Sequence, residues 1–243
     1  MKTIKGIWRF SRVICYTFVC LFQAYTRFKR VDRKEKGRML RYYPTQVLKL
    51  AGVRCSYEGN VPELLHECGL TDTPPAYMVL SNHISWLDIF SLDSQLPSRF
   101  IAKAEIAKWP VFGLIAQQIG TLFINRSSKR AILRINDDIR GALCNCEAVT
   151  IFAEGTTTFG NELLPIKANF IAPACEIGAT VQPVILSYKN KGKPTKRAAF
   201  AGDVTLFGSL WNVVNGRRRS SCSLSGTDYQ YKRSHAPRSS KDL

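Results

Sequence analysis

The stretch "AYMVLSNHISWLDIF", residues 76–90, joins a strand-like apolar run to the start of a helix. The segment "SWLD" fits the Ser-x-x-acid capping signature, with Ser85 as the N-cap and Asp88 as the third helical residue. On a regular helix, residues five apart point about 140° away from each other. His83 can therefore reach Asp88 only from the turn before the helix, by folding back towards it. The stretch predicts a strand, a turn and a capped helix.

Strand-like runs recur along the chain, and helical patterns lie between several of them. This alternation predicts an α/β fold: a single domain with a central mixed β-sheet covered by helices. Before it, residues 36–53 follow helical spacing that is interrupted at Pro44, and "VRCSYEG" follows as a short strand. We place the domain at residues 36–214. The predicted strands are residues 76–80, 99–102, 121–125, 149–153 and 181–188.

The N-terminal residues 1–35 combine an apolar run with basic flanks. The uninterrupted apolar part, residues 13–22, would span roughly 15 Å as a helix, about half of a bilayer's hydrocarbon core. A longer helix over residues 8–25 would cross only if Arg9 and Arg12 reach towards the headgroups. Each flanking basic residue contributes about 1 kcal/mol at an anionic surface. We predict a membrane-associated helix with a basic flank; a cleaved signal peptide and a buried core helix are the alternatives.

The net charge of the chain is +17, from 35 Lys and Arg against 18 Asp and Glu. Such an excess favours a polyanionic partner, either nucleic acid or an anionic membrane surface. The sequence contains no zinc-finger spacing, RNP-like segment or basic zipper. We therefore predict an anionic membrane surface as partner and no binding of nucleic acid.

The eight cysteines form no CxxC pair. The closest two, Cys144 and Cys146, have neither a second pair nor a nearby histidine with which to complete a zinc site. Free thiols in a reducing compartment are predicted, and no metal site.

Apolar content falls after Trp211, and the remaining sequence is basic and rich in serine. Its lack of periodicity is typical of disorder. Residues 215–243 are therefore predicted to form a basic, disordered tail without a further strand.

The pair of His83 and Asp88 has two interpretations. A carboxylate beside an imidazole fixes its tautomer and stabilises the imidazolium that forms when it takes a proton from a hydroxyl. By itself, however, the fragment is more typical of a helix cap preceded by a loop histidine. The sequence has no G-x-S-x-G elbow, Walker A loop or G-x-G-x-x-G.

Three further segments favour the catalytic interpretation: "GTLFINR" (120–126), "FAEGTTTFG" (152–160) and "VQPVILSY" (181–188). With "NHISWLD" they resemble, in order and spacing, the four sequence blocks of the glycerolipid acyltransferases that acylate lysophosphatidic acid. Segments 100–120 and 199–211 are also similar to that family. The resemblance covers about residues 36–214.

The resemblance implies a role for each matching residue. His83 would be the general base and Asp88 its orienting partner. Arg126, after the strand at residues 121–125, would bind the phosphate of the acceptor, and a guanidinium offers a fork of donors that suits a phosphate. Neither a metal nor an organic cofactor is implied.

The third block, Glu154, Gly155 and Thr156, follows a predicted strand, at the end where α/β sheets form ligand crevices. The resemblance implies that these residues bind substrate, as does Pro183 of the fourth block. The segment 152–160 departs from the commonest family pattern at two positions. That pattern has proline where Ala153 stands, and it has arginine or serine at position 157, which is threonine here. The consecutive threonines resemble a bacterial branch that also contains lyso-ornithine lipid acyltransferases, which leaves the acceptor open.

The function implied is an O-acyltransferase that moves an acyl chain from acyl-CoA or acyl carrier protein to the free hydroxyl of a lysophospholipid. The first candidate acceptor is 1-acyl-glycerol-3-phosphate, which would give phosphatidic acid. The alternatives are lyso-ornithine lipid as acceptor, or a catalytically degenerate membrane-bound scaffold. The expected location is the inner membrane, with the active site facing the cytoplasm.

Overall fold

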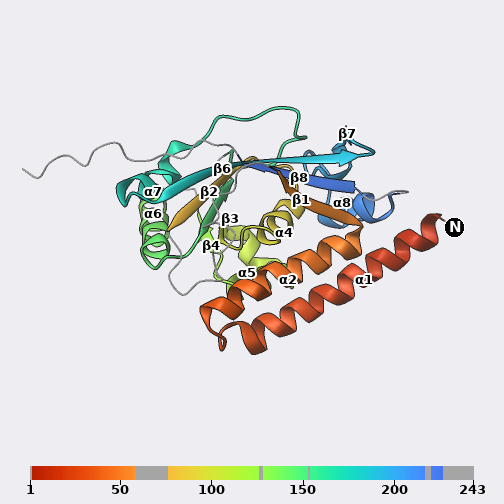
Figure 1. Cartoon of the computed structure of the whole chain (residues 1–243), viewed down its shortest axis with the longest axis horizontal. Helices are drawn as coiled ribbons and strands as arrows, with labels where there is room; N and C mark the ends of the chain where they lie inside the picture. Colours follow the sequence, from red (N-terminus) through yellow and green to blue (C-terminus); the bar gives the residue numbers. More distant parts are fainter. Residues whose placement is uncertain (1, 59–75, 126–127, 153, 217–219, 227–243) are drawn as a thin grey trace, which may run out of the picture.

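The computed structural model describes residues 2–58, 76–125, 128–152, 154–216 and 220–226. Within these ranges one eight-stranded sheet forms the centre of the molecule (Figure 1), in the order β1-β8-β6-β2-β5-β3-β4, with β7 paired to β6. The strands are β1 (Val53–Glu58), β2 (Tyr77–Ser81), β3 (Arg99–Lys103), β4 (Leu122–Ile124), β5 (Val149–Phe152), β6 (Thr180–Asn190), β7 (Lys193–Pro194) and β8 (Ser220–Gly226).

The sheet is mixed, because β6 pairs antiparallel with β7 and β8 while the other described pairs are parallel. The predicted fold class, an α/β domain with a central mixed sheet and covering helices, is confirmed, and each predicted strand is present. The helices are α1 (Lys2–Gln23), η1 (Ala24–Phe28), α2 (Arg33–Ala51), α4 (Leu87–Asp93), η2 (Ala104–Lys108), α5 (Phe112–Gln118), α6 (Lys129–Cys144), η3 (Ala168–Phe170), α7 (Ala172–Glu176), η4 (Lys196–Ala198) and α8 (Leu206–Val214).

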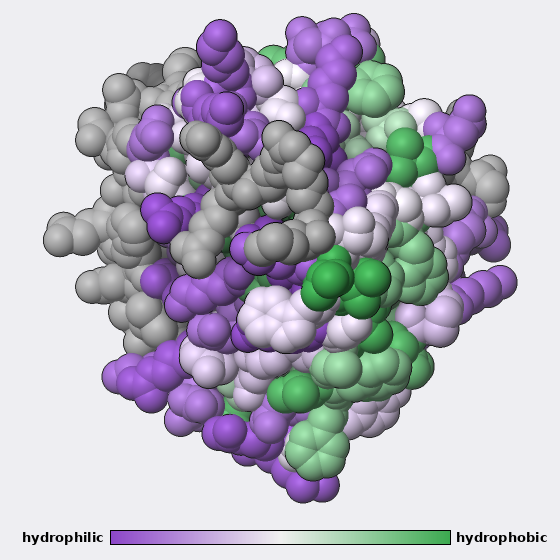
Figure 2. All heavy atoms as spheres, turned by 90° about the vertical axis from the view of Figure 1, so that its right-hand side faces the viewer, coloured by the Kyte–Doolittle hydropathy of each residue, from purple (hydrophilic) through white to green (hydrophobic). Residues whose placement is uncertain are grey.

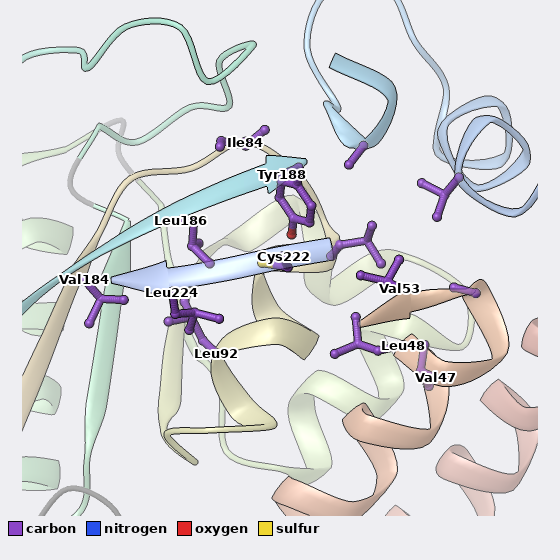
Figure 3. Packing of buried hydrophobic residues seen from close by; sticks show 14 of the residues in the cluster. Val47, Leu48, Val53, Ile84, Leu92, Val184, Leu186, Tyr188, Cys222 and Leu224 are labelled. Atoms are coloured by element: carbon purple, nitrogen blue, oxygen red, sulfur yellow. The ribbon is translucent and has the colours of Figure 1, made fainter. Parts of the chain in front are cut away.

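Two hydrophobic clusters lie on opposite faces of the sheet. Successive side chains of a strand point to opposite faces, so on β2 Tyr77 and Val79 join one cluster and Met78 joins the other. The first cluster packs the sheet against α2, α4 and α8 (Figure 3), and the second packs it against α6 and α7. The residues that carry the chemistry lie on the side of α4.

Helices α1 and α2 run side by side along one flank of the molecule and are joined by the π-helix η1 (Figure 1). Arg9 of α1 donates to the carbonyl oxygens of Val214 and Gly216, both at 3.3 Å. The predicted boundary between residues 35 and 36 falls inside α2. Pro44 lies within α2 without ending it, contrary to the predicted interruption. Among the described residues, no helix is both long and apolar enough to cross a bilayer.

Part of the predicted disordered tail forms strand β8. Residues 220–226 fall in the segment predicted to be disordered, yet they pair with β1 on one side and β6 on the other. Cys222 and Leu224 are fully buried in the first cluster. The prediction is therefore wrong for these residues, and residues 227–243 lie outside the described part of the chain.

Candidate active site

The loop between β2 and α4 carries the predicted base. Its first residue, Asn82, is bonded to Leu186 of β6 twice: Nδ2 donates to the carbonyl oxygen at 3.1 Å, and Oδ1 accepts the N–H at 2.7 Å. This side chain, which the sequence analysis did not single out, anchors the loop to the neighbouring strand. An amide between a strand and a turn was its only sequence signal.

The predicted cap is only partly formed, because the residue before the helix is Trp86 and not Ser85, and Trp86 makes no side-chain capping bond. Ser85 Oγ accepts the N–H of Leu87 at 3.2 Å, and Asp88 Oδ2 accepts the N–H of Ser85 at 2.8 Å. The helix begins at Leu87, two residues after Ser85, so Asp88 is its second residue and not its third. Asp88 is thus a cap as well as a candidate partner for His83.

His83 folds back onto Asp88, as the sequence predicted. Its Nδ1 lies 2.8 Å from Asp88 Oδ2, and since an ionised carboxylate can only accept, Nδ1 carries the proton. The other ring nitrogen, Nε2, then holds the lone pair that a general base needs. The imidazole stacks on Phe152, with ring centroids 3.9 Å apart and an 11° angle between the planes. The His83 side chain is 20% exposed and that of Asp88 is 0% exposed, so the base alone is open to substrate.

Asp88 is a buried carboxyl group whose two oxygens both have hydrogen-bond partners. Oδ2 also accepts the N–H of Ile84 at 2.7 Å, and Oδ1 accepts the hydroxyl of Tyr188 at 2.7 Å. Burying a carboxylate is costly unless it is hydrogen-bonded. Tyr188 was not predicted as a site residue; its only sequence signal was a polar group at the end of an apolar strand.

Glu154 is bonded to the backbone of the loop that carries His83. Its Oε1 accepts the N–H of His83 at 2.9 Å, and its Oε2 accepts the N–H of Leu164 at 3.0 Å. The residue is 5% exposed. The N–H of Thr158 donates to the carbonyl oxygen of His83 at 2.9 Å, so both backbone groups of the histidine are held by residues of the segment 152–160. This arrangement gives Glu154 a positioning role beside His83, and Glu154 does not line the cavity described below; its contact with substrate stays a prediction.

The structure places two of the remaining predicted residues at the cavity and one away from it. Gly155 and Thr156 line the same cavity as His83. Gly155 has φ +75°, a left-handed conformation that glycine adopts without strain. Pro183 lies on β6, opposite Leu80 of β2 and one residue before the described pairing of β6 with β8 begins. It is not part of the cavity wall. Arg126 lies outside the described residues.

A cavity of about 600 Å³ adjoins His83. One wall comes from α1, η1 and α2, and the other from α4, β3, η2 and α5; apolar side chains predominate. Asp93 is a buried acid in the wall, and burial raises the pKa of its carboxyl well above the usual range. The apolar lining includes Ala24, Phe28, Met39, Leu40, Val47, Trp86, Ile89, Phe90, Phe100, Ile106, Trp109, Phe112, Ile115 and Ile119.

Comparison with known proteins finds relatives that are named as two different acyltransferases. The chain is 43% identical over 146 residues to a 1-acyl-sn-glycerol-3-phosphate acyltransferase of Neisseria gonorrhoeae, a match that covers 60% of this chain and 57% of that protein. It is 40% identical over 141 residues to a lyso-ornithine lipid O-acyltransferase of Pseudomonas aeruginosa, covering 58% and 54% respectively. The match thus spans little more than half the length of these relatives.

A solved structure shares the fold. The crystal structure of the 1-acyl-sn-glycerophosphate (LPA) acyltransferase PlsC from Thermotoga maritima superposes with a TM-score of 0.60 at 16% identity, covering 98% of this chain and 90% of that one. The model of the Acyltransferase family matches residues 55–187, which is more than half of the 243 residues. The segment matched contains His83 and Asp88, and the chain belongs to the acyltransferase family.

Proposed function

We propose that this protein is an O-acyltransferase that moves an acyl chain from an acyl thioester to the free hydroxyl of a lysophospholipid. The observation that carries the proposal is a histidine held by a buried aspartate at 2.8 Å and exposed to an apolar cavity of about 600 Å³. The cavity suits an acyl chain, and the histidine suits the deprotonation of an alcohol.

In the proposed mechanism, Nε2 of His83 takes the proton of the acceptor hydroxyl as the oxygen attacks the thioester carbonyl. Asp88 stabilises the imidazolium that results. The new C–O bond forms, the C–S bond breaks, and the imidazolium returns its proton to the leaving thiolate, which departs as a free thiol. Backbone or loop donors would stabilise the oxyanion between the two steps. This sequence of steps uses no metal or organic cofactor.

The acceptor we place first is 1-acyl-glycerol-3-phosphate, with lyso-ornithine lipid as the alternative. Relatives of both names match the chain at similar identity. The predicted phosphate ligand, Arg126, favours the first acceptor, since a guanidinium pairs well with a phosphate. The consecutive threonines at 156–158 keep the second open.

A labelled-acyl assay tests this proposal. Purified full-length protein, incubated with lysophosphatidic acid and labelled acyl-CoA or acyl carrier protein, is expected to give labelled phosphatidic acid. Lyso-ornithine lipid serves as the competing acceptor, and each donor is tested with each acceptor. Label found only in ornithine lipid would replace the proposed acceptor. No transfer in any of the four combinations would favour a degenerate scaffold.

Helix α1 is proposed to lie in the interface of the inner membrane, on its cytoplasmic side. Its solvent-facing side carries Ile4, Trp8, Phe18 and Phe22, all at least 54% exposed and spaced as one helix face, and Tyr25 of η1 follows at 49% exposed. Figure 2 views the molecule from the side where α1 begins, and it shows apolar residues gathered along one part of this face. Exposed basic residues flank this face, which is the composition of an interfacial helix on anionic lipid.

Replacing Phe18 and Phe22 with serine is expected to weaken binding to vesicles of phosphatidylglycerol and phosphatidylcholine. Each ring that no longer enters the interface forfeits about 1.5–3 kcal/mol, so the double variant should bind at least about tenfold more weakly in a sedimentation assay. Leu133→Ser is the matched control, because Leu133 is 66% exposed on α6, across the sheet. Equal loss in both proteins would mean that α1 is not the membrane face.

A further inference from the structure

Tyr188 bonds to the catalytic pair from a neighbouring part of the sheet, on the face that packs against α4. It lies on β6, 100 residues away from Asp88 in sequence, and its hydroxyl donates to Asp88 Oδ1 at 2.7 Å. Tyr188 is 3% exposed and Asp88 is 0% exposed. Figure 3 shows the ring of Tyr188 beside Cys222 in the packed cluster between β6 and the helices.

The four hydrogen bonds to Asp88 are unevenly shared between its oxygens. Oδ2 accepts three, from His83 Nδ1 and from the N–H groups of Ile84 and Ser85. Oδ1 accepts one, from Tyr188, and within the described part of the chain no other donor reaches it. The charge on Oδ1 therefore depends on a single side chain, whereas that on Oδ2 is supported by the backbone.

The groups around Tyr188 leave it as a donor to Asp88. Burial, and next the charge of Asp88, raise the pKa of Tyr188 well above its usual value, so the phenol stays protonated. Two thiols face this site, Cys222 on β8 and Cys55 on β1. Both are free, as are the other described cysteines, seven in all, which agrees with the prediction of free thiols. A hydrogen bond with Cys55, and then burial, raise the pKa of Cys222. Ser91 Oγ lies 3.5 Å from the Tyr188 hydroxyl.

We propose that Tyr188 is a positioning residue of the acyl-transfer site: its hydroxyl caps Oδ1 of Asp88, keeping the carboxylate ionised with Oδ2 turned to His83. This role rests on the proposed function. It follows because an uncapped oxygen in a buried site favours the protonated carboxyl. A protonated Asp88 cannot stabilise the imidazolium on which acyl transfer depends.

The test is Tyr188→Phe, which removes the hydroxyl and keeps the ring. We expect kcat to fall about 10- to 100-fold, the scale of one hydrogen bond to a charged group, with the acceptor and donor KM within about twofold. The acidic limb of the pH–rate profile should move to higher pH. The reason is that the His83–Asp88 pair with a neutral imidazole and an ionised carboxylate loses the hydrogen bond from Tyr188, so the pair takes up a proton more readily. Tyr77→Phe is the control, since Tyr77 is equally buried on β2 and makes none of the bonds to Asp88.

A second variant covers the case in which Tyr188→Phe does not fold. Replacing Tyr188 with 3-fluorotyrosine keeps the hydroxyl and makes it a stronger donor, so the acidic limb should move to lower pH. An active wild-type enzyme whose acidic limb is the same in these proteins overturns the role of Tyr188 and leaves the proposed function intact. A wild-type protein that transfers no acyl group overturns both.

Discussion

His83→Ala is expected to lower kcat for acyl transfer by about 10²–10⁴, the usual contribution of a positioned acid–base group. His83 lines the cavity and is partly exposed, whereas Asp88 is too deeply buried to replace it as the base. Alanine removes the only member of the pair that the substrate can reach. Because the role of His83 is proton transfer and not binding, KM should change little. Initial rates with labelled acyl donor and lysophosphatidic acid measure the effect.

The fold should survive this substitution. The backbone N–H and carbonyl oxygen of His83, bonded to Glu154 and Thr158, do not depend on its side chain. Circular dichroism and the melting temperature give the control. A folded His83→Ala protein with near-normal activity would refute the assignment of the base.

Asp88→Asn is expected to lower kcat by about 10²–10⁴ as well, because a neutral amide does not stabilise the imidazolium. The structure offers the amide an acceptable set of bonds. Its oxygen can accept the N–H groups now on Oδ2, and the Tyr188 hydroxyl can turn to accept from Nδ2 and donate towards Ser91. The melting temperature should therefore change little while turnover falls.

Asp88→Ala separates the capping role of Asp88 from its chemical role. Alanine removes every bond to the N–H groups of the loop, and loss of such a cap costs about 1 kcal/mol or more. We expect Asp88→Ala to lower the melting temperature more than Asp88→Asn does. If Asp88→Asn lowers the melting temperature but keeps full activity, Asp88 is a helix cap and nothing else.

Strand β8 shows why the end of the domain could not be predicted. Its sequence "SSCSLSG" contains only two apolar side chains, Cys222 and Leu224, in a region of serines and arginines. Such a segment becomes a strand because β1 and β6 pair with its backbone on both sides. Intrinsic strand preference is weak where pairing and burial decide the outcome.

Pro44 shows a related error within a helix. Proline removes one hydrogen bond and was expected to interrupt the helix. In the structure Pro44 is buried, and α2 continues through it while packing on α1 and α4. Tertiary packing outweighed the local preference.

The sequence by itself determined the local chemistry: a strand, a turn and a capped helix that bring His83 and Asp88 within reach of each other, because these contacts join residues at most five apart. Only the tertiary structure decided the cavity between α1, α2 and α5, the support of His83 by Glu154, and the bond from Tyr188 to Asp88. The partners in these contacts lie 71 and 100 residues apart. Their meeting depends on the order of strands in the sheet, which periodicity along a single chain does not encode.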